Sequence, residues 1–296
     1  MSTDSSLSYD VFVADPAPMN GSAPLPNGEP RVYQPIAVTL VHGTRDAVLV
    51  DPPLTTAQAR AVGDWVEAHG RRLTHIVATH GHGDHWFTAD VLARRFGAQV
   101  VASAAAIEQM HLNVSAREVL WDAMWPGQIP ASPVTAVPAP GGRIGLEGHD
   151  LTLVDVGHAD SDDCSVLHVP DLDLVVAGDV LYNGVHLYLA ESGGDFGAWR
   201  ACLDAVQALE PRHIVASHQN PSLDDDARRL IAETRQYLDT AQDALAKYGS
   251  PVEFFHAMDE RYPERLGHTV LWVSARALYL AREGGDPLQN LLTAWL

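Results

Sequence analysis

Cysteine and basic residues are scarce in this chain of 296 residues. The two cysteines, Cys164 and Cys202, both have apolar neighbours. Two cysteines cannot build the disulfide framework of a small secreted domain, so we expect buried thiols rather than one bridge. Lysine and arginine number 19 against 38 aspartates and glutamates, which gives a formal net charge of −19. This balance argues against nucleic acid and anionic membranes as partners, because both bind to basic surfaces.

Long apolar runs are also missing. No stretch reaches the roughly 20 apolar residues that a membrane-spanning helix needs. Residues 1–10 lack the basic and apolar regions of a signal peptide, so we expect a cytoplasmic protein. A hydrophobic content of 46% with 19% charged residues is typical of a globular protein with a large core.

Strand and helix patterns alternate along the chain, which predicts an α/β fold with sheets inside and helices outside. We expect one catalytic core over residues 36–222, preceded by an N-terminal strand and a Pro/Gly-rich arm in 1–35. A helical extension packed on the core is expected over 223–296. Strands are predicted at 36–41, 47–50, 75–78, 99–102, 151–156, 165–169, 174–177 and 213–216, and helices at 56–69, 88–96 and 196–209.

The most informative segment is Thr79-His80-Gly81-His82-Gly83-Asp84-His85, which follows the apolar run Ile76-Val77-Ala78. Four metal-capable side chains lie within six residues, and the glycines between them permit a tight turn. Imidazole and carboxylate are ligands that suit zinc and neighbouring divalent metals. The pattern therefore predicts a metal site on the loop after a strand.

Three further candidate ligands each follow an apolar strand. His158 comes after 151–156, Asp179 after 174–177 and His218 after 213–216. Each residue alone is ordinary, because a strand-end Asp is commonly a turn residue and a single His commonly structural. Their common position after strands, downstream of the first motif, favours a site with two metal ions.

Together these motifs resemble those of the metallo-β-lactamase superfamily. The resemblance covers about Val38 to Asn220, and implies a four-layer αβ/βα sandwich with a metal site on one edge. It implies that one metal is held by His80, His82 and His158, and a second by Asp84, His85 and His218, with Asp179 bridging them. Two Zn²⁺ ions per chain are expected, with Fe or Mn as alternatives.

Catalysis in such a site would use a hydroxide shared by the metals, and we expect Asp84 to orient it. Tyr182 lies three residues after Asp179, a spacing that resembles the substrate-facing tyrosine of the superfamily's N-acyl-homoserine lactonases. It is either an oxyanion donor or a buried tyrosine bonded locally. Asp51, after an early strand, is either a partner of a ligand imidazole or a plain turn residue. His186 is a weaker candidate for a residue that faces the cleft.

Aromatic residues near the motif bear on the substrate. Trp86 and Phe87 follow directly where many relatives have glycines, and we expect them at the mouth of the site, next to an apolar part of the substrate. Trp121, Met124 and Trp125 form either a substrate wall or ordinary core.

The resemblance favours a dinuclear zinc hydrolase that attacks a small carbonyl ester or lactone. A β-lactamase or a thioester hydrolase on the same site remains an alternative, as does a mono-iron oxygenase that acts on persulfides. Asp179, where some relatives have cysteine, favours the lactonase and thioesterase branches. We expect a small-molecule substrate with an apolar portion, and a homodimer is possible. The helices after Leu223 could pack on the core, mediate that dimer or narrow the pocket.

Overall fold

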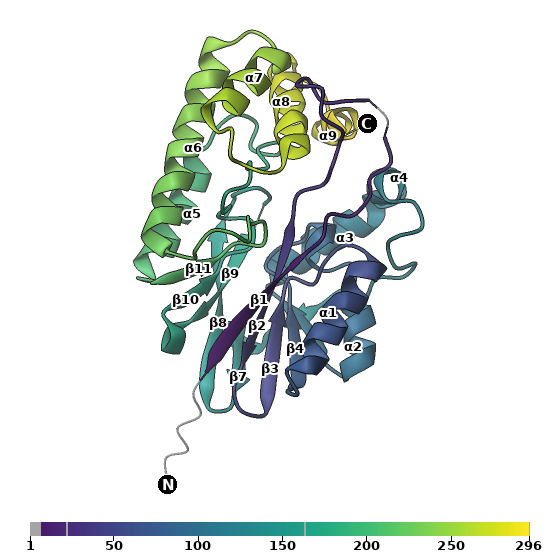
Figure 1. Ribbon diagram of the computed structural model, residues 1–296, viewed down its shortest axis with the longest axis vertical. Helices are drawn as coiled ribbons and strands as arrows, with labels where there is room; N and C mark the ends of the chain where they lie inside the picture. Colours follow the sequence, from purple (N-terminus) through teal and green to yellow (C-terminus); the bar gives the residue numbers. More distant parts are fainter. Residues whose placement is uncertain (1–6, 22, 163, 296) are drawn as a thin grey trace.

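Two β-sheets organise the chain in the computed structural model, which describes residues 7–21, 23–162 and 164–295. In the six-stranded sheet β1, β2 and β3 run antiparallel, and β4 to β6 continue parallel to β3. Its strands are β1 (Ser8–Ala14), β2 (Ile36–His42), β3 (Asp46–Val50), β4 (Arg72–Val77), β5 (Gln99–Ala102) and β6 (Val137–Pro138). This sheet takes most of its strands from the first part of the chain (Figure 1).

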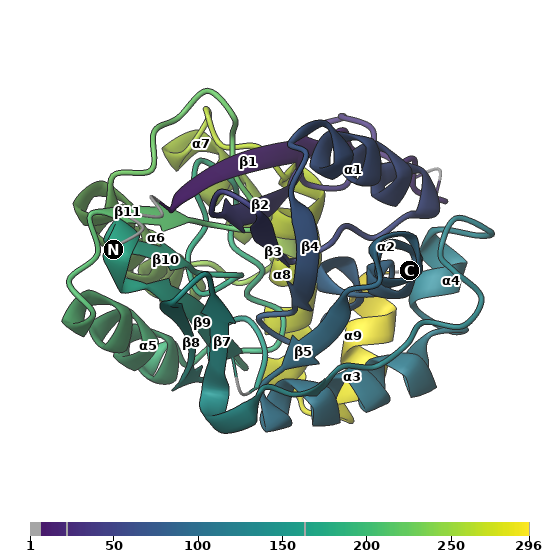
Figure 2. The same cartoon turned by 90° about the horizontal axis from the view of Figure 1, so that it is seen from below.

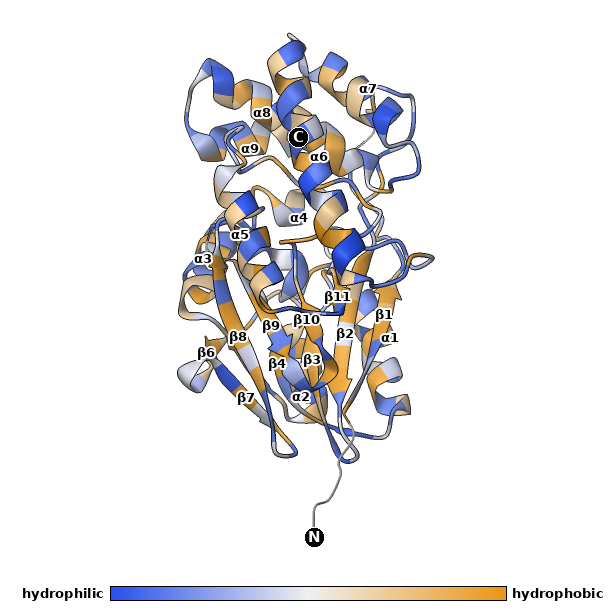
Figure 3. Ribbon diagram, turned by 90° about the vertical axis from the view of Figure 1, so that its left-hand side faces the viewer, coloured by the Kyte–Doolittle hydropathy of each residue, from blue (hydrophilic) through white to orange (hydrophobic). Residues whose placement is uncertain are grey.

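The five-stranded sheet has the order β11-β10-β9-β8-β7, in which only the β10–β11 pair is parallel. Its strands are β7 (Arg143–Leu146), β8 (His149–Gly157), β9 (Cys164–Val169), β10 (Leu174–Val176) and β11 (His213–Val215). One apolar cluster joins the two sheets, with Val48 and Val77 from the first and Leu167 and Val176 from the second. The apolar colouring of the strands in Figure 3 follows this shared core.

Helices cover the outer faces of both sheets, which gives the four layers that the sequence predicts (Figure 2). The helices beside the first sheet are α1 (Thr56–Ala68), α2 (Ala89–Phe96), α3 (Ala104–Ala116) and α4 (Trp121–Met124), and α5 (Gly197–Ala208) packs on β8. The last four helices gather at one end of the molecule (Figure 1): α6 (Ala227–Lys247), α7 (Pro251–Arg261), α8 (His268–Glu283) and α9 (Pro287–Trp295). Among the described residues, no helix is both long and apolar enough to cross a membrane.

Local sequence signals explain most element boundaries. Helix α1 begins after Thr55, whose side chain accepts from the Gln58 amide while Gln58 bonds back to Thr55, a capping box. Strand β4 begins at Arg72, three residues before the predicted start; the polar residues Arg72 and Thr74 on either side of the buried Leu73 hid this part of the strand. Strand β7 escaped prediction because it is four residues long and pairs with β8 only at the edge of its sheet. Cys164 and Cys202 are free and buried, as expected.

Candidate active site

The candidate ligands meet because they follow strands that end at the same edge of the sandwich. Asp51 follows β3, and the segment Thr79–His85 follows β4. From the second sheet, Asp160 comes after β8, Asp179 after β10 and His218 after β11. Ligands from both sheets are thereby brought into one cluster.

Glycine is required between the first ligands because the loop is tightly enclosed. A Cβ at Gly81 would lie 2.3 Å from Cβ of Gln109, and one at Gly83 would lie 2.1 Å from Cε2 of Phe87. Residues Gly83–His85 form a short 3₁₀ turn, so Asp84 and His85 follow His82 without a break.

Three overlapping groups of ligand atoms make up the cluster, and within each group the atoms lie within 4.8 Å of one another. The groups share His80 and His85, so they form one continuous site. They are His80, His82 and Asp160; His80, His85 and Asp179; and Asp84, His85 and His218.

The four histidines are oriented as metal ligands usually are, with one ring nitrogen in the cluster and the other held from outside. Nδ1 of His80 lies 3.1 Å from Oγ1 of Thr79, and Nδ1 of His218 lies 2.7 Å from the carbonyl oxygen of Pro35. Nε2 of His82 lies 2.9 Å from Oε1 of Glu191.

Asp51 contacts His85, the fourth histidine of the cluster, and the loops around it. Its carboxylate lies 3.3 Å from Nδ1 of His85. The same carboxylate accepts hydrogen bonds from the amide and hydroxyl of Thr79 at 2.8 Å each, and from the Ser217 hydroxyl at 2.6 Å. Asp51 is therefore a supporting residue of the site rather than a plain turn residue.

Several buried atoms in the cluster make no regular hydrogen bond among the described residues. They are Nδ1 and Nε2 of His85, Nε2 of His218, Oδ2 of Asp160 and Oδ1 of Asp179. Buried polar atoms rarely lack a hydrogen-bond partner. A bound cation would provide a partner for all of these atoms except Nδ1 of His85, which lies beside Asp51. The donor set of imidazoles and carboxylates fits one or two divalent metal ions.

The charges in the cluster favour the ionised forms of His218 and Asp84. Burial lowers the pKa of His218, but the neighbouring carboxylate of Asp179 raises it more, to about 9. Burial opposes ionisation of Asp84, yet His85 and His218 hold its pKa below the usual range. The carboxylates are therefore ionised and available as ligands at neutral pH.

The structure places His158 outside the cluster and Asp160 inside it. Nδ1 of His158 lies 2.6 Å from Oδ1 of Asp162, and its side chain is 27% exposed. Asp160 is fully buried, with Oδ2 3.0 Å from Nδ1 of His82 and 3.5 Å from Nε2 of His80. Six of the seven predicted ligands thus come together, and Asp160, which the sequence did not predict, lies beside His80 and His82.

Tyr182 is buried with its hydroxyl on a ligand rather than toward the cavity. The hydroxyl donates to Oδ2 of Asp179 at 2.7 Å, and the ring stacks on His218. The described residues that line the cavity do not include Tyr182. In this arrangement Tyr182 positions Asp179 and is not a free oxyanion donor. His186 also points away, toward Tyr237 of α6.

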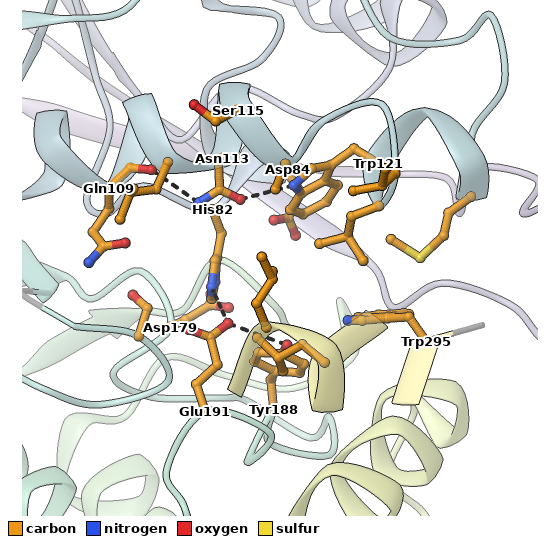
Figure 4. A pocket seen from close by; sticks show the side chains of 18 of the residues that line it. His82, Asp84, Gln109, Asn113, Ser115, Trp121, Asp179, Tyr188, Glu191 and Trp295 are labelled. Atoms are coloured by element: carbon orange, nitrogen blue, oxygen red, sulfur yellow. Dashed lines mark hydrogen bonds and ion pairs between the residues drawn. The ribbon is translucent and has the colours of Figure 1, made fainter. Parts of the chain in front are cut away.

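A cavity of about 450 Å³ opens onto the cluster (Figure 4). His82, Asp84 and Asp179 form its polar floor, with Glu191 beside His82. Its walls are mostly apolar and come from α3, the α3–α4 segment, α4 and α9: Leu112, Ala116, Leu120, Trp121, Met124, Leu288, Leu291 and Trp295. Trp121 and Met124 thus belong to a wall, whereas Trp125 is buried behind it.

The expectation that Trp86 and Phe87 lie at the mouth of the site is wrong. Both are fully buried, because the 3₁₀ turn at Gly83 directs them beneath the metal-binding loop. The indole of Trp86 donates to the Gly81 carbonyl at 2.8 Å. They support the loop from behind and do not contact the cavity.

Two residues of the site carry no recognisable sequence signal. The hydroxyl of Tyr33, on the N-terminal arm, donates to Oδ2 of Asp84 at 2.8 Å. Glu191 lies between His82 and the hydroxyl of Tyr188, which is 3.4 Å away. Both come from irregular segments, where periodicity gives no indication of what a side chain contacts.

Comparison with known proteins agrees with this geometry. The family model of the metallo-beta-lactamase superfamily matches residues 33–218. A UPF0173 metal-dependent hydrolase of Thermococcus kodakarensis is 30% identical over 210 residues, which cover 67% of this chain and 89% of that protein.

Solved structures share the fold at low identity. A metallo-beta-lactamase family protein of Thermus thermophilus gives a TM-score of 0.59 at 19% identity, covering 94% of this chain and 96% of that one. The metallo-beta-lactamase FIM-1 of Pseudomonas aeruginosa, in its mono-zinc form, gives a TM-score of 0.55 at 20% identity. The match covers 80% of this chain and 92% of that one.

Fold, cluster and relatives together define a metal-dependent hydrolase. The chain belongs to the metallo-beta-lactamase superfamily, which confirms the family and the fold inferred from its motifs.

Substitution of Asp160 and substitution of His158 should have different effects on metal binding. Asp160→Ala should lower the metal content of the purified protein, because it removes a buried ligand, whereas His158→Ala should leave it unchanged. Plasma mass spectrometry after exposure to a fixed chelator concentration measures both. If only His158→Ala lost metal, His158 rather than Asp160 would be the ligand.

Asp51→Asn should weaken metal binding about 10- to 100-fold, the usual effect of losing an outer partner of a ligand histidine. Competition with a chromophoric chelator measures this affinity. Asp46→Asn, at a half-buried carboxylate that pairs with Arg72 outside the cluster, is the matched control. Equal affinities in the two variants would mean that Asp51 only shapes the turn.

Proposed function

We propose that this protein is a dinuclear zinc hydrolase of small carbonyl esters or lactones that carry an apolar acyl portion. The observation that carries the proposal is a mostly apolar cavity whose floor is a cluster of imidazoles and carboxylates. Bound divalent metal ions would supply Lewis acidity and lower the pKa of water toward neutrality. The protein's own residues supply binding, orientation and proton transfer.

Asp84 is the residue best placed to handle the proton. Its carboxylate lines the cavity, and Oδ2 lies 3.2 Å from Nε2 of His218. Such a group can take the proton that an attacking water loses and return it to the departing alkoxide. The hydrogen bond from Tyr33 fixes Oδ2 of Asp84 during both transfers.

The apolar walls favour a substrate with a hydrocarbon part. Trp295 of α9 lies across the cavity from Trp121 (Figure 4), and Leu291 of α9 also lines it, so the C-terminal helices narrow the pocket. A volume of about 450 Å³ suits a medium-sized acyl chain with its carbonyl at the polar floor. Burial of each methylene would stabilise the complex by about 0.8 kcal/mol.

Asp84→Ala should retain the fold and lose ester and lactone hydrolysis by about 10²- to 10⁴-fold, the contribution of a positioned general base. Circular dichroism checks the fold, and plasma mass spectrometry checks that the wild type holds two zinc ions. Asp64→Ala, whose side chain is 75% exposed on α1, is the control. Normal turnover by folded Asp84→Ala, or one iron per chain without hydrolysis, would contradict the proposal.

Acyl-chain length tests the apolar wall. Leu291→Ala should lower kcat/KM for a decanoyl ester about tenfold and leave that for an acetyl ester unchanged, because only the long chain reaches α9. Steady-state kinetics on esters of graded chain length measure this difference. Leu223→Ala, on the surface outside the cavity, is the matched control. An equal effect on both esters would mean that α9 does not contact the substrate.

A further inference from the structure

A second cluster of metal-capable side chains lies outside the active site. It consists of His186, Asp259 and His268, whose ligand atoms lie within 4.8 Å of one another. His186 follows β10 in the core, Asp259 is on α7, and His268 is the first residue of α8. The cluster therefore joins the catalytic core to the C-terminal helices.

The backbone fixes the segments that carry the two histidines. Val185 and Leu266 form an isolated parallel bridge, the His186 amide donates to the Leu266 carbonyl at 2.8 Å, and the Leu266 amide donates to the Gly184 carbonyl at 3.0 Å. The two imidazole rings are consequently held with their centres 5.3 Å apart.

His186 presents an unused nitrogen to this cluster. Its side chain is fully buried, and Nδ1 lies 2.9 Å from the hydroxyl of Tyr237. Nε2 has no hydrogen-bond partner among the described residues. A buried imidazole nitrogen without a partner is costly, because burial removes water and supplies nothing in its place.

His268 repeats the arrangement. Nδ1 lies 2.9 Å from Oε2 of Glu29, and Nε2 lies 3.0 Å from Oδ1 of Asp259 without forming a regular hydrogen bond. One nitrogen is thus held by an outer carboxylate and the other is turned toward a second carboxylate. The histidines of the active site have the same pattern, which is the usual one for metal ligands.

We propose that His186, His268 and Asp259 bind a zinc ion that fastens the C-terminal helices to the core. Two imidazoles and one carboxylate are a common zinc ligand set, with water in the fourth position. A second cavity of about 450 Å³, lined by Glu29, His268 and Thr269 among others, adjoins the cluster at His268. Glu29 orients His268, so the N-terminal arm is tied to the same point.

Zinc stoichiometry of the full-length protein tests the site. The wild type, Asp259→Asn, His268→Gln and the control His256→Gln on α7 are stripped with chelator, reloaded with excess ZnCl₂ and passed through a gel-filtration column. Plasma mass spectrometry should find one zinc per chain fewer in Asp259→Asn and in His268→Gln than in the wild type and the control. Zinc should also raise the thermal unfolding midpoint of these two variants less than that of the wild type.

The double variant Asp160→Ala/Asp259→Asn tests whether this site binds zinc independently of the active site. It should hold one zinc per chain fewer than Asp160→Ala alone. Asp259 and His268 are both partly exposed. Circular dichroism identifies any variant that fails to fold. If one of the two variants does not fold, the zinc stoichiometry of the other tests the site. Unchanged stoichiometry in a folded variant would overturn the proposal. His268 would then be a structural residue that joins Glu29 to Asp259 without a metal ion.

Discussion

The buried carboxylate of Asp51 is the constraint on which the active site depends. It follows β3 of one sheet, yet it binds Thr79 after β4 and Ser217 after β11 of the other sheet. Its φ of +54° lies in the left-handed region, which costs a non-glycine residue stability and persists only where surrounding contacts impose it. The three hydrogen bonds impose it here, and through them one anion sets the positions of ligands from both sheets.

Charge balance explains why the cluster requires cations. Asp51, Asp84, Asp160 and Asp179 are all buried, so the site carries four negative charges when its histidines are neutral. Burying unpaired carboxylates is costly. The four histidines do not all offset them, because burial lowers the pKa of His80. Two divalent ions would supply the missing four positive charges. The partners on the outer histidine nitrogens then keep the rings in the orientation that those ions need.

The metal motif and the strand ends could be predicted from sequence because each has a short-range signal. A histidine-rich loop after an apolar strand needs only the order of residues, and so do Asp179 and His218. Asp160 was missed because it lies two residues beyond His158, in a loop that begins at Gly157 with a φ of +101°, and only the backbone decides which side chain turns inward. Glu191 reaches the site through a long-range contact that no local pattern encodes.

The cavity is shaped in part by segments of the chain outside the shared core. The family model ends at residue 218, whereas Leu288, Leu291 and Trp295 line the cavity from α9. Helix α9 is held by α8, and α8 begins at His268 beside the core loop of His186. This wall of the cavity is therefore positioned by the contact between the core and the C-terminal helices. The zinc proposed there would act on specificity by fixing that wall, without touching the reacting atoms.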